Sequence, residues 1–402
     1  LERRAGFSLA LWEALTKGLP GDTVFVGLSS IHWREAWKYG ERAFRYCQHD
    51  AGHAMAALGM AAAGLGWQVR LLDDLGTEQL ALLMGIADRH GIEAEHPDCL
   101  LAVYPQGQTG STLTVPEPPL AALAKLSWQG TENVLSRGHV EWPIIDAVAE
   151  STEKPPTEVA SSPPYSTLEG GGGWLRSAPA SLSLRQVVRQ RRSAVAMDPG
   201  GALDRDAFYS ILSRTLPRQG QFPFNLLPWH PRVHLVLFVH RVEGLAPGVY
   251  LLLRDPKEGK ALRLALKSRF AWETPASCPE GLALYRLATG NVQAVTRQLS
   301  CNQSIASDGC FSLGMLAEFE EPLRDSGPWF YRRLFWECGV IGQVLYLEAE
   351  AAGVRGTGIG CFFDDGVHAL LGLETERYQC LYHFTVGHPV EDERIRTLPA
   401  YP

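Results

Sequence analysis

The most constraining feature of this sequence is a segment that occurs twice. Phe44–Asp74 reads FRYCQHDAGHAMAALGMAAAGLGWQVRLLDD, and Leu334–Asp365 reads LFWECGVIGQVLYLEAEAAGVRGTGIGCFFDD. Placing Gly52 on Gly342 aligns the two copies with a period of 290 residues. A repeat of this size indicates one supersecondary unit built twice, so we expect a duplicated fold.

Each copy predicts the same order of elements. A run rich in Ala, Leu and Met has apolar residues at helical spacing and small residues on one face, which predicts a buried helix. A short apolar stretch, WQVRLL or GIGCFF, then predicts a strand, and EQLALLMGI or GVHALLGL a second helix. A final strand follows at Cys99–Tyr104 and at Cys380–Gly387. The sequence therefore predicts a mixed α and β fold.

The stretch between the copies differs in composition. Residues 151–173 read STEKPPTEVASSPPYSTLEGGGG, with too little apolar surface to offset the entropy of ordering the chain. We therefore predict a first domain over residues 1–150, a flexible linker over 151–180 and a second domain over 181–402. The second half has predicted helices at Ser183–Arg192 and Arg205–Arg214 that the first half lacks. We therefore expect the first domain to be truncated at its N-terminal side.

Composition excludes several classes of protein. Of the 402 residues 46% are apolar and 20% charged, and no apolar run approaches the roughly 18–20 residues of a membrane helix. The net charge is −7 with scattered basic residues, so neither a membrane nor a nucleic acid is expected as a partner. Eight dispersed cysteines without a CxxC pair predict reduced thiols and a cytoplasmic location.

Four motifs in order resemble one family. These are the basic segment Val187–Ser193, the turn VEGLAPGVY, the Ala-rich helix ending in GVRGTGIG, and the closing VGHPVEDERIRTLPAYP. Together they resemble the SagB/ThcOx dehydrogenase branch of the nitroreductase superfamily, and Lys38–His53 resembles that branch's central segment. The resemblance implies an α+β fold, with a central, mostly antiparallel sheet flanked by helices. It also implies FMN held at the interface of two such domains, here an intramolecular pseudo-dimer of the two halves.

The resemblance also implies particular cofactor-binding residues. The family grips the flavin phosphate with an Arg-x-Ser-x-Arg pattern and with basic residues near the C-terminus. Guanidinium groups and a hydroxyl suit a phosphate because they form charge-assisted hydrogen bonds. In this sequence Val195 stands at the last position of the pattern. The residues that match are Arg191, Arg192, Ser193, Arg394 and Arg396, and the glycines Gly356, Gly358 and Gly360 are expected to let the backbone approach the flavin closely.

A Lys-Tyr pair serves the azoline-oxidising members of this branch, and Lys38 and Tyr39 match it. A lysine beside a phenol can transfer a proton during hydride transfer if burial brings both pKa values toward neutrality. The resemblance thus implies an FMN-dependent oxidoreductase that uses NAD(P)H or its substrate as electron donor. The expected substrate is a small molecule or a peptide.

Other interpretations remain open. Val195 and the bulky Phe224–Pro231 segment, FNLLPWHP, favour a degenerate relative that has lost flavin and serves as a scaffold or binding subunit. The glycines of GVRGTGIG do not fit a dinucleotide fingerprint, because there the helix precedes the strand. His49 and His53 have the spacing of a zinc-binding helix, but no third ligand is recognisable, so we expect no metal site.

Overall fold

The computed structural model describes residues 3–4, 6–88, 91–130, 133–158, 182–218 and 222–394, together with residues 396 and 398. The chain forms two compact units. Unit 1 comprises residues 1–164, 220–230 and 326–339, and unit 2 comprises residues 165–219, 231–325 and 340–402. Within the described residues no helix is long and apolar enough to cross a membrane.

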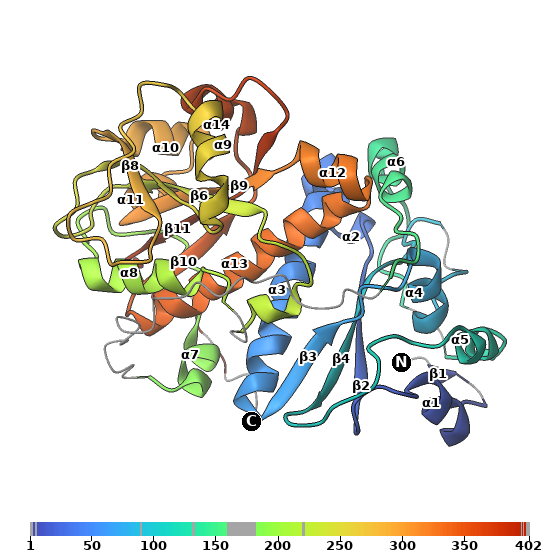
Figure 1. Ribbon diagram of the computed structural model, residues 1–402. Helices are drawn as coiled ribbons and strands as arrows, with labels where there is room; N and C mark the ends of the chain where they lie inside the picture. Colours follow the sequence, from blue (N-terminus) through green and yellow to red (C-terminus); the bar gives the residue numbers. More distant parts are fainter. Residues whose placement is uncertain are drawn as a thin grey trace. The chain divides into compact units, whose positions relative to one another are not determined.

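Unit 1 is built around a three-stranded antiparallel sheet in the order β2-β4-β3 (Figure 1). Apolar side chains of β4 pack with those of α1, α4 and α5, which places a core on one face of this sheet. The strands are β1 (Arg3–Arg4), β2 (Val24–Ser30), β3 (Trp67–Leu71), β4 (His96–Pro105) and β5 (Trp128–Gln129). The helices are α1 (Leu9–Leu15), α2 (Trp33–Tyr39), η1 (Gly40–Arg42), α3 (Ala43–Gly64), α4 (Thr77–Met84), α5 (Glu117–Ala124), α6 (Pro143–Ser151) and η2 (Phe224–Leu226).

Unit 2 contains a six-stranded sheet in the order β10-β11-β9-β6-β7-β8, in which every neighbouring pair is antiparallel. The predicted antiparallel α+β architecture is therefore confirmed. The strands are β6 (Val233–Val239), β7 (Gly248–Leu252), β8 (Leu284–Thr289), β9 (Phe311–Glu318), β10 (Arg355–Ile359) and β11 (Tyr378–Gly387).

Helices cover both faces of the unit 2 sheet. Apolar side chains of α9, α10 and α14 form the core on one face, whereas Phe208 of α8 contacts Phe311 and Tyr346 of α13 contacts Phe384 on the other (Figure 1). The helices are α7 (Leu184–Gln190), α8 (Arg205–Arg214), η3 (Pro256–Glu258), α9 (Gly259–Ala265), α10 (Gln293–Leu299), α11 (Ile305–Asp308), α12 (Glu320–Ser326), α13 (Phe330–Ala351) and α14 (Asp364–Leu371).

The repeated segment has the same element order and lengths in both halves. Helices α3 and α13 each have 22 residues, β3 and β10 five, α4 and α14 eight, and β4 and β11 ten. Gly52 and Gly339 are each the tenth residue of their helix. The alignment of Gly52 with Gly342 was therefore wrong by three residues, because small residues recur along α13 and the sequence does not say which of them matches.

Within unit 1, α3 packs closely against the beginning of α13. A Cβ placed on Gly52 would lie 2.9 Å from the Cα of Gly339, and one placed on Gly339 would lie 2.8 Å from the Cα of Gly52. The indole nitrogen of Trp336 donates a hydrogen bond of 2.7 Å to the side-chain oxygen of Gln48. The two helices thus approach each other through Gly52 and Gly339. The small residues of α3 had predicted that this helix is buried, and Gly339 is the residue that Gly52 faces.

The first residues of the predicted flexible linker, 151–180, are held by backbone hydrogen bonds. The carbonyl of Lys154 accepts a 2.8 Å hydrogen bond from the Thr77 amide, and the amide of Thr157 donates 2.9 Å to the carbonyl of Asp74. These residues are therefore anchored to the start of α4, because their backbone groups pair with the preceding loop. Positions 159–180 of the predicted linker lie outside the described residues.

Two cysteines also differ from the prediction of reduced thiols. Cys301, after α10, and Cys361, after β10, form a disulfide with their Cα atoms 5.9 Å apart, a distance that a disulfide readily spans. Six other cysteines are free in the described part of the chain. The prediction missed the pair because two loops distant in sequence meet only in the folded unit.

Candidate functional site

The residues expected to hold a phosphate follow a short helix of unit 2. Ser183 caps α7 by accepting a hydrogen bond from the amide of Gln186. The helix ends at Gln190, and Arg191 is extended, with φ −51° and ψ 129°. The predicted helix over Ser183–Arg192 is therefore shorter at both ends, so Arg191 and Ser193 lie on a loop, where both side chains can turn toward α13.

Two hydrogen-bond donors and one guanidinium group gather around the phenol of Tyr346. The guanidinium carbon of Arg191 lies 4.8 Å from the centre of the Tyr346 ring. The hydroxyl of Ser193 donates to the Tyr346 oxygen over 3.1 Å, and the amide of Gly358 donates to the same oxygen over 2.9 Å. We call Arg191, Ser193, Tyr346 and Gly358 the Tyr346 cluster. Tyr346 itself was missed, because a single tyrosine in a core helix gives no sequence signal.

The glycines of β10 are required by neighbouring aromatic side chains. A Cβ on Gly356 would lie 2.6 Å from the Phe384 ring, and one on Gly358 would collide with the hydroxyl of Tyr382. Both aromatic residues belong to β11, which pairs with β10. Close packing across the strands therefore explains these two glycines without a flavin. Gly360 follows β10 and is half-buried.

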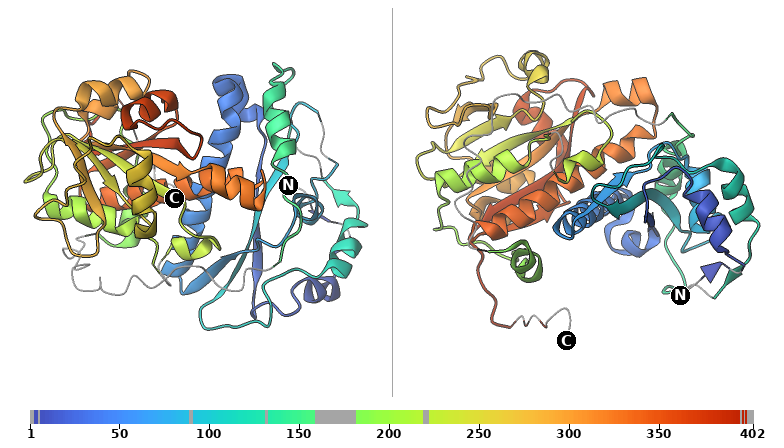
Figure 2. Two further views of the ribbon diagram at one scale, coloured as in Figure 1. Left: turned by 45° about the horizontal axis from the view of Figure 1, so that its top comes forward. Right: turned by 60° about the horizontal axis from the view of Figure 1, so that its bottom comes forward.

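The other predicted basic residues make no described contact with Tyr346. The guanidinium of Arg192 donates to the carbonyls of Arg191 and Arg189, at 2.7 and 3.3 Å. Arg394 pairs with Asp392 over 2.7 Å, with 90% of its side chain exposed, and Arg396 is exposed. They belong to the segment that follows β11 and runs away from the sheet (Figure 2). No contact described for Arg394 or Arg396 joins either residue to Arg191 or Ser193.

Lys38 and Tyr39 form the last turn of α2 in unit 1, and both side chains are exposed. The ammonium of Lys38 lies 4.9 Å from the centre of the Tyr39 ring. A hydrogen bond with Tyr39 raises the pKa of Lys38. The burial that would bring the pKa of this lysine toward neutrality is therefore absent, because the pair lies on the surface and the neighbouring oxygen stabilises the ammonium. The catalytic role of the pair stays a prediction.

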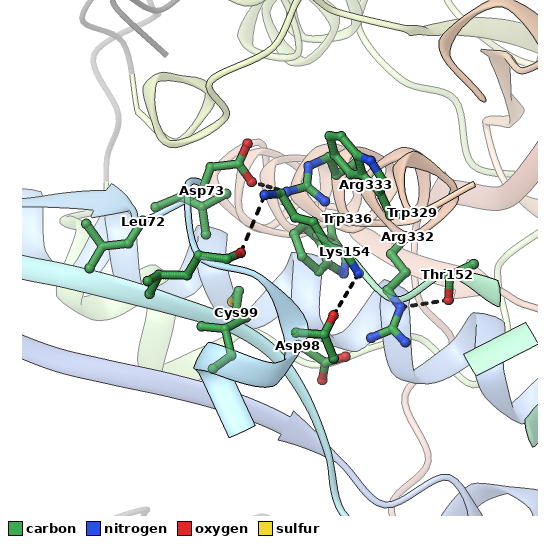
Figure 3. A pocket seen from close by; sticks show the side chains of 14 residues that line it. Leu72, Asp73, Asp98, Cys99, Thr152, Lys154, Trp329, Arg332, Arg333 and Trp336 are labelled. Atoms are coloured by element: carbon green, nitrogen blue, oxygen red, sulfur yellow. Dashed lines mark hydrogen bonds and ion pairs between the residues drawn. The ribbon is translucent and has the colours of Figure 1, made fainter. Parts of the chain in front are cut away.

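Unit 1 also holds a buried basic cluster that the sequence analysis missed. Figure 3 shows Arg333 directed at Asp73 and Arg332 at Thr152. The Arg333 guanidinium carbon lies 4.2 Å from the centre of the Trp329 ring. Burial lowers the pKa of Arg333, and Asp73 opposes that shift. Burial, then the charge of Arg333, lowers the pKa of Lys154 to about 8.

The space inside this basic cluster is small. The cavity lined by these side chains measures about 20 Å³, which is close to the room for one water molecule. Arg332 further donates to the carbonyl of Ala149 over 3.0 Å and to that of Pro97 over 3.3 Å. The cluster therefore ties the start of α13 to β4 and to the end of α6. The guanidinium groups of Arg332 and Arg333 already bind protein oxygen atoms.

The bulky Phe224–Pro231 segment packs largely within unit 1. Leu226 faces Gly59 of α3, and the Trp229 ring lies 6.4 Å from that of Trp336. Its apolar residues are thus held in a core, and the loss of flavin that this segment favours stays a prediction. Within the described residues no group of three or more His, Cys, Asp or Glu side chains is placed to hold a metal ion. The ring of His49 contacts that of Phe335, with 5.1 Å between centres.

Comparison with known proteins finds a match to one family model and to solved structures. Residues 265–388 match the model of the Nitroreductase family. The solved "putative nitroreductase" of Anabaena variabilis is 18% identical, aligned over 91% of this chain and 69% of its own, with a TM-score of 0.62. The Escherichia coli microcin synthetase McbBCD complex with truncated pro-MccB17 bound is 19% identical over 59% of this chain and 79% of its own, with a TM-score of 0.37.

These matches differ in what they show. Among curated proteins none matches this sequence. The similarity to the Anabaena structure concerns the fold, since the identity is low, and the second TM-score is too low to support an argument. Residues 265–388 match the Nitroreductase family model, and the chain has an α+β fold of the nitroreductase type, so the matched segment and the fold both agree with the expected family.

Proposed function

We propose that this chain is an FMN-dependent oxidoreductase of the nitroreductase type, and that the Tyr346 cluster of unit 2 holds the flavin phosphate. The observation that carries the proposal is that two donors converge on the Tyr346 oxygen while the Arg191 guanidinium lies over the same ring. Arg191 brings a positive charge, Ser193 a hydroxyl and Gly358 a backbone amide. Such a set suits a phosphate, whose oxygens accept charge-assisted and neutral hydrogen bonds together.

The remaining residues take supporting roles in this proposal. Bound FMN supplies the hydride chemistry, with NAD(P)H or the substrate as electron donor, and the protein orients and tunes it. Arg394 and Arg396 contribute positive charge from the C-terminal tail. Lys38, whose pKa is raised, stays protonated at neutral pH, which rules out a role as a base and leaves its ammonium to act by its charge or as a proton donor. Tyr39 accompanies it, and the substrate is a small molecule or a peptide.

The alternative is a flavin-free scaffold of the same fold, such as a SagB-type relative that has lost its cofactor. Two observations favour it. Val195, where the family pattern has a second arginine, is 73% exposed. The Tyr346 phenol already occupies the point at which the donors converge. Titration of the purified protein with FMN separates the two functions, because only an oxidoreductase requires the flavin.

The first test compares two neighbouring arginines. Arg191→Ala removes the charge beside Tyr346, and we expect FMN affinity to fall by about 10–100-fold, since a hydrogen bond to a charged group contributes about 1.5–3 kcal/mol. Arg192→Ala is the matched control, because its guanidinium binds carbonyls of its own segment. Calorimetric titration measures both affinities. No flavin absorbance and no FMN uptake by the intact chain would establish the scaffold function instead.

A further inference from the structure

Within the described residues, β2 is an edge strand of the unit 1 sheet, whereas the equivalent strand of unit 2, β9, lies inside its sheet. Strand β9 lies between β11 and β6, and all eight of its residues are buried. Strand β2 has the equivalent place beside β4, but among the described residues it pairs with β4 alone. Of its seven residues only Ser30 is buried. Strand β2 thus has a described neighbour on one side, whereas β9 has neighbours on both sides.

The register of β4 shows which backbone groups of β2 point outward. The carbonyl of Leu100 accepts from the amide of Leu72 on the β3 side. Because backbone groups alternate in direction along a strand, those of Leu101 point to β2, where Val26 is the partner. The amides and carbonyls of Phe25 and Gly27 therefore point away from β4. Unpaired groups of this kind form a template for another strand.

A hollow of about 400 Å³ adjoins this edge. It is lined by Leu28 of β2 and by side chains of α2 and α3, among them Glu35, Asp50 and Ala51. Glu95 and Asp98 add two further carboxyl groups. Arg34, the basic residue among the described lining residues, pairs with Glu93 over 2.7 Å.

The charge of the hollow selects its occupant. Its acidic lining favours a cation over an anion, and β2 itself, VFVGLSS, contains no charged residue and no proline to oppose pairing. A strand added beside β2 would direct alternate side chains into the hollow, because side chains alternate between the faces of a sheet. A basic side chain at such a position would meet Glu35 and Asp50.

We propose that the outer edge of β2 binds an extended polypeptide segment of a partner, which adds a strand to the unit 1 sheet and places a basic side chain in the acidic hollow. Backbone hydrogen bonds to Phe25 and Gly27 supply affinity, and the carboxylates of the hollow supply selectivity. This inference is independent of flavin binding, since every residue it uses belongs to unit 1 and none to the Tyr346 cluster.

The experiment measures fluorescence anisotropy of two labelled peptides titrated with the full chain. One alternates valine with lysine and the other valine with glutamate. We expect the lysine peptide to bind about tenfold or more tightly than the glutamate peptide. Gly27→Pro removes an outward amide without touching the bonds to β4, and it should weaken binding about tenfold. Gly27→Ala is the matched control, since its Cβ meets only the flexible end of Met84.

Asp50→Lys provides a second variant that leaves the backbone unchanged. It should abolish the preference for lysine, and it keeps the test decisive if the proline variant fails to fold by circular dichroism. Equal binding of both peptides, or unchanged binding by Gly27→Pro and Asp50→Lys, would refute the proposal. A dimer in analytical ultracentrifugation that Gly27→Pro dissociates would refute it too, because a second copy of the chain would then close the edge.

Discussion

Gly52 leaves no room for a side chain where α3 meets α13. A Cβ at this position would collide with the backbone of Trp336 and Gly339, which cannot turn aside as a side chain can. We expect Gly52→Ala to lower the free energy of unfolding by about 1–3 kcal/mol through overpacking, although alanine favours a helix by about 1 kcal/mol over glycine.

Urea unfolding of Gly52→Ala measures this loss, and Gly59→Ala is the control in the same helix. Its Cβ would meet only the end of the flexible Leu226 side chain, at 2.7 Å, so that its stability should stay near that of the wild type. Equal stability of the two variants would mean that the glycine crossing does not set the distance between the helices.

Buried His383 couples the stability of unit 2 to pH. Its ring stacks on Phe362 with centres 4.4 Å apart, and Nδ1 lies 3.1 Å from the Ser300 hydroxyl. Burial lowers its pKa from 6.5 to about 3. The folded state therefore keeps this histidine neutral at a pH where the unfolded chain already binds a proton. Its contribution is present above pH 6.5 and is lost as the pH falls toward about 3.

We expect wild-type stability to fall below pH 6.5 by at most about 1.4 kcal/mol per pH unit for this group. His383→Gln keeps a hydrogen-bonding side chain without titrating, so its stability should change less over the same range. Exposed His139→Gln serves as the control for loss of a histidine. Denaturant unfolding at stepwise lower pH measures all three, and parallel curves for His383→Gln and the wild type would contradict the assignment.

At the scale of elements, the disulfide joins the loop after α10 to the loop after β10. Cys301 and Cys361 are 60 residues apart in sequence, so their bond restricts a long loop of the unfolded chain. Its loss should lower the free energy of unfolding by about 2–4 kcal/mol. Urea unfolding with and without dithiothreitol measures this difference. The variant with both cysteines changed to serine is the control, because dithiothreitol should not change its stability. A wild-type urea midpoint that is the same with and without dithiothreitol would contradict the disulfide.

At the scale of the whole molecule, α13 is shared by both units. Phe330–Gly339 belongs to unit 1, and the rest of the helix belongs to unit 2. Because a helix is cooperative along its length, we expect a single unfolding transition by calorimetry, with Gly52→Ala moving the whole transition. Two transitions, of which Gly52→Ala shifts one, would show that the units unfold independently despite the shared helix.

The sequence by itself determined the elements and the fold class. Helical and alternating patterns are properties of neighbouring residues, so α3, α13 and a mixed α and β fold could be predicted from them. The antiparallel sheet was predicted from the resemblance to a family instead. The motif around Arg191 and Ser193 likewise marked two residues that lie together. The repeat was visible too, but its register was not, because Gly339 and Gly342 are equally small.

Only the tertiary structure decided what depends on distant parts of the chain. It brought Tyr346 to Arg191 and joined Cys301 to Cys361. It also left β2, which pairs with β4 alone in the described part of the chain, beside an acidic hollow. Each of these features requires two or more segments far apart in sequence to meet, and the path of the loops between them sets that meeting. Local sequence patterns contain no information about the path of these loops. The sequence therefore predicted helices such as α3 and α13 but none of these contacts.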